Sequence, residues 1–232
     1  MTAKFWEKFK YKSFLSGNII LINADCEAVM AEIGDKEIDF SCWDLPYGIN
    51  YQYNTYLDNE NNLIKLINNI SPYIKKINKR ACLFVGITNL MKYPQYDWLL
   101  SYSYNTTANF GKLGYNQWQP ILFYGEDVKG FGNVNNILKS DTIKFSGGSD
   151  IGFLNKEPKF HPCQKPIKVI SYLINRFSFE NDLIFDAFAG SFTTAIACIR
   201  TKRRFIGVEL DPVYFEKAVE RVDTELKQLT LF

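Results

Sequence analysis

The residues best suited to chemistry are Asp44-Leu45-Pro46-Tyr47, which directly follow a predicted strand. An Asp-x-Pro-aromatic tetrad arises by chance in roughly a few per cent of chains of this length. The exocyclic amine of a nucleic-acid base is a poor nucleophile, because its lone pair is delocalised into the ring. Two acceptors aimed at its hydrogens favour an attacking geometry. Asp44 can supply one acceptor, and the carbonyl of Leu45, which is biased to an extended conformation because it precedes proline, can supply the other. Tyr47 has the ring to stack on an extruded base. The alternative is a turn that only ends the strand.

A second candidate site lies in the strand, turn and helix at 183–199. Small residues at Ala187, Ala189, Gly190 and Ser191 let a ligand approach the backbone before a helix N-terminus. Glu209 follows nineteen residues after Gly190, at the end of the next predicted strand, where a carboxylate can bind ribose hydroxyls. The spacing indicates a nucleoside cofactor and leaves open NAD, S-adenosylmethionine or an ordinary tight turn.

The elements that must position these residues alternate between short apolar runs and amphipathic stretches, which predicts an α/β fold. We expect strands at 19–23, 38–42, 81–85, 121–124, 183–185 and 205–208. Helices are expected at 26–33 and near 60–76. Three more are expected in the last third of the chain: one begins at Pro166, one follows the turn at 186–191 and runs through Ile199, and the last begins at Asp211-Pro212. The stretch at about 88–160 is irregular, so we predict a single domain over 1–232 with a substrate-recognition insert there.

Composition narrows the class of protein. A net charge of +2 and a pI near 8.1 exclude a polybasic protein but not a nucleic-acid enzyme. Five scattered cysteines without a C-x-x-C pair argue against disulfides or a structural zinc site, and predict a reducing, cytoplasmic location. We expect neither a signal peptide nor a membrane span, because the sequence shows no long uninterrupted apolar run, and we expect no metal site.

Three ordered motifs resemble the β-group DNA amino-methyltransferases, which methylate adenine or cytosine amines. That family has D-P-P-Y, then H-P-x-Q-K-P, then D-P-F-x-G-S-G-T-T. This chain has DLPY at 44–47, HPCQKP at 161–166 and DAFAGSFTT at 186–194. LINADCEAVM, GYNQWQPILFYG and GVELDPVYFEKA resemble three further family segments. The resemblance covers nearly the whole chain.

The resemblance implies a Rossmann-like S-adenosylmethionine-dependent methyltransferase fold, a seven-stranded, mostly parallel sheet with helices on both faces. It implies that the tetrad from Asp44 to Tyr47 holds the target amine. It also implies a set of cofactor contacts. Phe188, Gly190 and Ser191 surround the methionine end, with Ala189 and Thr193 in the same segment; Glu209 binds the ribose, Asp25 the adenine ring, and Gln164 and Lys165 lie near the carboxylate.

We therefore expect direct methyl transfer from S-adenosylmethionine to the N6 amine of a flipped adenine in double-stranded DNA. Asp44 at the head of the tetrad favours adenine over cytosine. The alternatives are an N4-cytosine or RNA amino-methyltransferase. Enzymes that methylate glutamine amides carry the cofactor motif before the tetrad, and an NAD dehydrogenase leaves DLPY and HPCQKP unexplained. The short recognition insert indicates either a short target sequence or a homodimer sharing one.

The chain departs from the family pattern at three positions. Leu45 and Ala187 each replace a proline, which we expect to be mild. Phe192 replaces a glycine of the segment at 186–194, which we call the cofactor turn after its predicted role. Its ring must point away from the cofactor, or the pocket is reshaped or blocked. A catalytically silent subunit is therefore a further alternative. His161, the only histidine, is expected to order its loop rather than act as a base.

Overall fold

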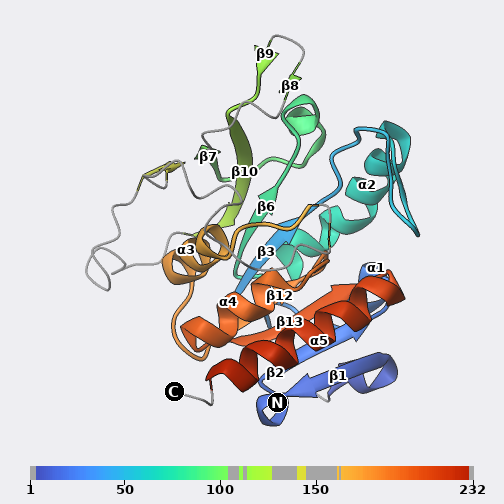
Figure 1. Ribbon diagram of the computed structural model, residues 1–232. Helices are drawn as coiled ribbons and strands as arrows, with labels where there is room; N and C mark the ends of the chain where they lie inside the picture. The colour runs from blue at the N-terminus through green and yellow to red at the C-terminus, as the bar shows by residue number, and fades with distance from the viewer. Residues whose placement is uncertain are drawn as a thin grey trace.

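A nine-stranded sheet forms the centre of the protein in the computed structural model, which describes residues 4–103, 110–111, 114–126, 140–144, 161 and 163–229 (Figure 1). In spatial order the strands are β1 (Lys10–Phe14), β2 (Ile19–Asn23), β13 (Arg204–Glu209), β12 (Leu183–Asp186), β3 (Phe40–Asp44), β6 (Arg80–Phe84), β10 (Trp118–Gly125), β7 (Trp98–Ser103) and β11 (Thr142–Ile143). The predicted insert at 88–160 falls partly outside the described residues.

Five neighbouring strands, from β2 to β6 in this order, run parallel, whereas β1 and β10 pair antiparallel with their neighbours. The prediction of a mostly parallel sheet is confirmed. The sheet has nine described strands rather than seven, because the short strands β1 and β11 extend its two edges.

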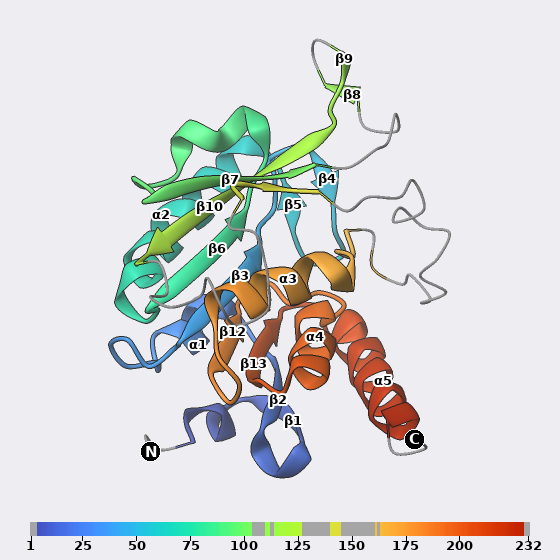
Figure 2. The same ribbon diagram turned by 90° about the vertical axis from the view of Figure 1, so that its left-hand side faces the viewer.

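Helices cover both faces of the sheet (Figures 1 and 2). One face packs against α3 (Ile167–Phe177), α4 (Thr193–Thr201) and α5 (Pro212–Leu229), the other against α1 (Cys26–Met30) and α2 (Glu60–Lys76). Side chains alternate along each strand, so Ile19 and Leu21 of β2 join the first cluster and Ile20 and Ile22 the second. Burying each of these side chains stabilises the fold by roughly 1.5–3 kcal/mol.

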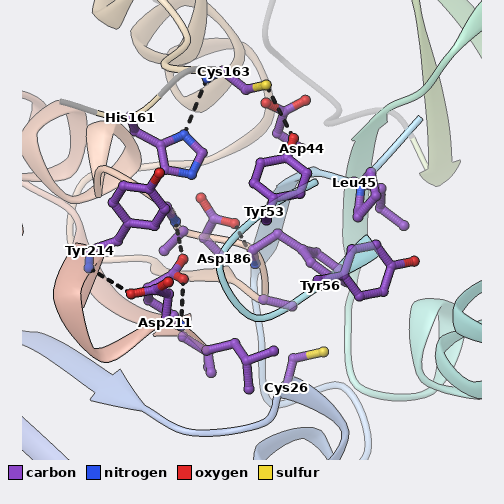
Figure 3. A pocket seen from close by; sticks show the side chains of 18 of the residues that line it. Cys26, Asp44, Leu45, Tyr53, Tyr56, His161, Cys163, Asp186, Asp211 and Tyr214 are labelled. Atoms are coloured by element: carbon purple, nitrogen blue, oxygen red, sulfur yellow. Dashed lines mark hydrogen bonds between the residues drawn. The ribbon is translucent and has the colours of Figure 1, made fainter. Parts of the chain in front are cut away.

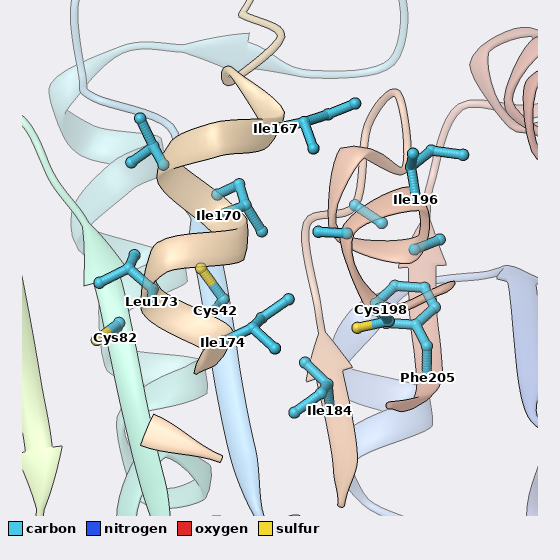
Figure 4. Close-up of a cluster of buried hydrophobic side chains, with 14 of the residues drawn as sticks. Cys42, Cys82, Ile167, Ile170, Leu173, Ile174, Ile184, Ile196, Cys198 and Phe205 are labelled. Carbon is cyan, nitrogen blue, oxygen red and sulfur yellow. The ribbon is translucent and has the colours of Figure 1, made fainter. Parts of the chain in front are cut away.

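The side chains of α3 and α4 meet above the strands in the first cluster (Figure 4). On α3 they are spaced three and four residues apart, as the apolar periodicity predicts: Ile167, Ile170, Leu173, Ile174 and Phe177 are all buried. Three of the five free cysteines, Cys42, Cys82 and Cys198, are buried among them. Burial raises the pKa of these thiols, so they act as small apolar side chains.

Several predicted element boundaries are correct and others shift. The strand at 19–23 and the helix at 60–76 match β2 and α2. The predicted boundaries of the strand at 38–42 are wrong by two residues, since β3 covers 40–44. Trp43 and Asp44 pair with Leu83 and Phe84 of β6, whereas Ile38 makes only an isolated bridge. The helix predicted to 33 ends at Met30, where N–H groups begin to bond three residues back.

The strand order brings the tetrad beside the cofactor turn. Strand β12, which leads into the turn, is hydrogen-bonded in parallel to β3, with Ile184 opposite Phe40 and Phe185 opposite Ser41. The carboxyl ends of the five parallel strands therefore meet at one edge of the sheet, which is where open α/β sheets bind ligands. Among the described residues, no helix is long and apolar enough to cross a membrane.

Candidate active site

A pocket of about 500 Å³ opens at this edge of the sheet (Figure 3). The tetrad at the end of β3 and the glycine turn at the end of β12 both line it. Every residue predicted for the site is among the lining residues: Asp25, Asp44, Leu45, Pro46, Tyr47, Gln164, Lys165, Phe188, Ala189, Gly190, Ser191, Thr193 and Glu209. The two predicted loops therefore share one cavity, and the individual roles of these residues stay predictions.

Asp44 lies at the centre of a hydrogen-bonded cluster on the tetrad side. The Tyr47 hydroxyl donates to Asp44 Oδ1 at 2.5 Å, and the Lys165 ammonium donates to Asp44 Oδ2 at 2.6 Å. Lys165 also reaches the Tyr47 hydroxyl at 2.8 Å, and the Gln119 amide donates to it at 2.5 Å. Burial, followed by the charge of Asp44, raises the pKa of Tyr47 well above its usual value. The phenol is therefore a proton donor to Asp44 at neutral pH.

Two polar side chains, Asp58 and Asn89, hydrogen-bond to the backbone at the end of the tetrad. The carboxylate of Asp58, which is buried at the end of β5 (Leu57–Asp58), accepts from the N–H groups of Tyr47 at 3.0 Å and Gly48 at 2.6 Å. The Asn89 amide donates to the Tyr47 carbonyl at 2.6 Å. Gly48 has φ +70°, and a Cβ there would lie 2.9 Å from Asn89. These contacts fix the chain direction after Asp44.

Two carboxylates, the buried Asp186 and the half-buried Glu209, order the cofactor turn. Glu209 accepts from the N–H groups of Gly190 at 2.9 Å and Asp211 at 2.8 Å, one on each oxygen. Asp186 accepts from the Phe188 N–H at 3.0 Å and the Thr194 hydroxyl at 2.6 Å. Burial raises the pKa of each carboxyl to about 7, although these hydrogen bonds lower it. Both groups therefore titrate near neutral pH.

Phe192 does not enter the pocket. Its side chain is 0% exposed and packs edge-on against the rings of Phe205 and Phe215 in the core, at centroid distances of 6.2 and 6.4 Å. Its backbone is left-handed, with φ 55° and ψ 36°, a conformation that glycine adopts without strain. The pocket is lined by its neighbours Ser191 and Thr193 instead. Of the two alternatives that the sequence leaves open, the structure has the one in which the ring points into the core and away from the pocket.

His161 lines the pocket between Cys163 and Tyr214 (Figure 3) and lies against Gly190 of the cofactor turn. Its ring lies so close to Gly190 (φ +50°) that a Cβ on that glycine would be 3.2 Å from the imidazole. Nδ1 accepts from the Cys163 N–H at 3.3 Å, while the loop before Pro162, which His161 is predicted to order, lies outside the described residues. The rings of Tyr53 and Tyr214 flank it at centroid distances of 6.2 and 4.6 Å. Burial lowers the pKa of His161, which favours the neutral ring.

Several lining residues were not predicted from the sequence. Tyr53 and Tyr56 come from the segment joining β4 (Tyr51–Gln52) to β5, where the sequence showed only an Asn-rich loop. Phe84, at the end of β6, forms another part of the wall. The density of tyrosines at 51–56 is the signal that would have marked this loop.

Asp25 caps helix α1, and its Oδ1 accepts from the N–H groups of Glu27 and Ala28. Gln164 Oε1 and the Tyr56 hydroxyl are buried without a hydrogen-bond partner among the described residues, and both residues line the pocket. Buried polar atoms of this kind are suited to a polar ligand. No three His, Cys, Asp or Glu side chains in the described part of the chain come together as metal ligands.

Comparison with known proteins identifies the family. A family model described as DNA methylase, of the N6/N4 class, matches residues 73–220. The type II methyltransferase M.HpaI of Haemophilus parainfluenzae is 26% identical, covering 88% of this chain and 74% of that protein. The DNA adenine methyltransferase YhdJ of Escherichia coli K12 is 37% identical over 73 residues, which are 32% of this chain and 25% of that protein.

Solved structures show the same fold. The M1.HpyAVI–SAM complex superposes with a TM-score of 0.64 at 19% identity, over 88% of this chain and 99% of that one. The cytosine-N4-specific PvuII DNA methyltransferase gives a TM-score of 0.66 at 12% identity, over 91% of this chain and 92% of that one. Because the family model covers more than half of the chain, the protein belongs to the N6/N4 DNA methylase family.

Proposed function

We propose that this methylase transfers a methyl group from S-adenosylmethionine to the N6 amine of adenine in double-stranded DNA. The target base is flipped out of the helix into the pocket. The observation that carries the proposal is the shared cavity: Asp44 and Gly190, 146 positions apart in sequence, line one pocket of about 500 Å³. A base amine and a methyl donor can meet there without further rearrangement of the sheet.

The pocket contains groups that fit the cofactor. Glu209 is anchored by two backbone N–H groups, and its carboxylate is suited to ribose hydroxyls. Gln164 Oε1 is a buried acceptor without a partner in the described part of the chain, which fits an ammonium group. Asp25 uses Oδ1 to cap α1, which leaves Oδ2 for an adenine amine. S-adenosylmethionine supplies the methyl group as a sulfonium, and a solved relative with this fold is named as its complex.

The tetrad prepares the nucleophile. Asp44 and the Leu45 carbonyl accept the two amine hydrogens and turn the nitrogen lone pair toward the donor. The new N–C bond forms as the donor's S–C bond breaks, and the amine nitrogen becomes positively charged. It then loses a proton readily, so no strong base is needed. The buried Leu45 side chain and the hydrogen bonds that Asp58 accepts from the N–H groups of Tyr47 and Gly48 keep this acceptor pair in place.

Two observations favour adenine over cytosine. The tetrad begins with Asp44, as in adenine-specific members of the family that the chain resembles. YhdJ, one of the more similar relatives over its aligned segment, is named as a DNA adenine methyltransferase. The cytosine-N4-specific PvuII enzyme shares the fold, so N4-methylcytosine is the second candidate product.

A homodimer whose two subunits share one target sequence stays a prediction. Analytical ultracentrifugation with and without DNA measures the oligomeric state.

The test uses long DNA made by polymerase chain reaction, which carries no methylated bases. The protein is incubated with this DNA and radiolabelled S-adenosylmethionine, and the product is digested to nucleosides. We expect label in N6-methyladenine and none after Asp44→Ala, while calorimetric titration gives the variant a cofactor affinity within about twofold of wild type. Label in N4-methylcytosine refutes the adenine assignment, and an active Asp44→Ala variant refutes the mechanism.

A further inference from the structure

The Lys165 ammonium is hydrogen-bonded to the carboxylate that the proposed mechanism assigns to the target amine. Its Nζ is 2.6 Å from Asp44 Oδ2 and 2.8 Å from the Tyr47 hydroxyl. It also lies 5.4 Å from the ring centroids of both Tyr47 and Phe84, within the range of cation–π attraction. The side chains of Lys165 and Asp44 are only 14% and 20% exposed, so solvent weakens this ion pair less than a surface one.

A base amine bound for methylation has the same requirements as this ammonium. It is a nitrogen that donates N–H groups to Asp44 and lies against aromatic rings. We propose that Lys165 is a displaceable stand-in for the target amine: it occupies the amine position in the free enzyme and leaves Asp44 when the base enters. The proposal rests on the proposed function, because it concerns the same target site.

Each oxygen of the Asp44 carboxylate already accepts one hydrogen bond, so an incoming amine either shares an oxygen with the present donor or replaces that donor. Oδ1 of Asp44 accepts from Tyr47, and Oδ2 accepts from Lys165. The Tyr47 oxygen accepts from Gln119 and Lys165 while its own proton goes to Asp44. Tyr47 and Gln119 are carried by the tetrad turn and by β10, whereas Lys165 reaches in from the loop before α3. Lys165 is therefore the donor whose departure gives the amine its acceptor.

The charge developed in the reaction requires the same departure. Methyl transfer moves positive charge onto the amine nitrogen, and the Asp44 carboxylate stabilises that charge. An ammonium within hydrogen-bonding distance of the same carboxylate repels the positive charge on the amine nitrogen and offsets the negative charge of Asp44. A base without an exocyclic amine brings no N–H donor to replace the ammonium. The ion pair between Lys165 and Asp44 therefore also discriminates in favour of bases that carry an amine.

Nuclear magnetic resonance of ¹⁵N-lysine-labelled enzyme tests the displacement without turnover. The Lys165 Nζ signal is assigned by its loss in Lys165→Met, and S-adenosylhomocysteine at saturating concentration fills the cofactor side. Deoxyadenosine should shift this signal in a saturable way, while purine deoxyriboside, which has the same ring without the amine, should not. Equal shifts with both nucleosides, or no shift with deoxyadenosine, overturn the proposal.

Steady-state methylation of the same unmethylated DNA gives a second readout. Lys165→Met should lower the KM for DNA about fivefold, because the base no longer competes with the lysine for Asp44. Lys168→Met, which removes an exposed charge three residues away on α3, controls for DNA electrostatics and should not lower KM. A lower kcat with unchanged KM would mean that Lys165 assists catalysis. Absence of methylation by wild type refutes the proposed function instead, and the nucleoside titration still decides the role of Lys165.

Discussion

Replacing Phe192 by glycine separates two reasons for which a family motif can require glycine. One reason is space for the ligand, and the other is a left-handed backbone. Phe192 has φ 55° and ψ 36°, while its ring is fully buried against Phe205 and Phe215 and does not line the pocket. The structure therefore predicts that Phe192→Gly changes stability and leaves cofactor binding alone.

The magnitude follows from two opposing effects. Removing a fully buried phenylalanine ring costs about 3–5 kcal/mol in comparable cores. Glycine also removes the strain of a left-handed backbone at a residue with a Cβ, which stabilises the folded state by about 1–2 kcal/mol. We expect a net loss of about 1–4 kcal/mol in the free energy of unfolding. Phe192→Ala loses the ring and keeps the strain, so it should be less stable than Phe192→Gly by up to about 1 kcal/mol.

Urea denaturation measures both stabilities, and calorimetric titration with S-adenosylmethionine measures binding in the folded variants. We expect the dissociation constants of wild type and Phe192→Gly to agree within about twofold. The reasoning fails if the glycine variant binds the cofactor ten or more times tighter, because the phenylalanine would then restrict the pocket. A glycine variant more stable than wild type would mean that the ring contributes little to the core.

Three further predictions concern residues that hold the two loops. Asp58→Ala leaves the N–H groups of Tyr47 and Gly48 without their acceptor. It should lower the free energy of unfolding, measured by urea denaturation, by about 1–3 kcal/mol. It should also lower kcat without changing cofactor affinity, and an unchanged kcat would mean that Asp58 does not position the tetrad. Gly190→Ala places a Cβ 3.2 Å from His161 at φ +50°, so titration should show at least about tenfold weaker cofactor binding, partly restored by adding His161→Ala. Burial raises the pKa of Glu209 to about 7, and ribose hydroxyls bind the ionised form, so cofactor affinity should be about tenfold weaker at pH 6 than at pH 8; Glu209→Gln should lose most of this dependence, and a flat wild-type profile would refute the assignment.

The position of the site could be predicted from the sequence, because the candidate motifs follow predicted strands. In a parallel sheet, residues that come directly after strands are gathered at one edge regardless of their separation along the chain. Asp44 at the end of β3 and the turn after β12 needed only that rule and the family motif order. The strand β1 was not predicted, since its residues are almost all exposed and carry no apolar alternation.

The contacts that give the site its electrostatic state could not be predicted. Lys165 and Asp44 are 121 residues apart, and the sequence gives no reason to pair this lysine with the tetrad rather than with a cofactor carboxylate. Gln119 lies 72 residues from Tyr47, and its contact depends on the register of β10 against β6. Side-chain pairs of this kind depend on tertiary geometry at the scale of one ångström, which local periodicity does not contain.

Phe192 shows why a motif departure is hard to interpret from sequence alone. A glycine with positive φ and a glycine that makes room for a ligand look identical in a motif, and only the direction of the Cα–Cβ bond distinguishes them. Here that bond points into the core, where Gly207 of β13 leaves space: a Cβ at 207 would lie 2.9 Å from the Phe192 ring and 2.4 Å from the Phe205 ring. The glycine missing from the turn is thus matched by one in the neighbouring strand. A Gly207→Ala substitution should therefore destabilise the core by about 1–3 kcal/mol through overpacking, although it touches neither the tetrad nor the cofactor turn's lining atoms.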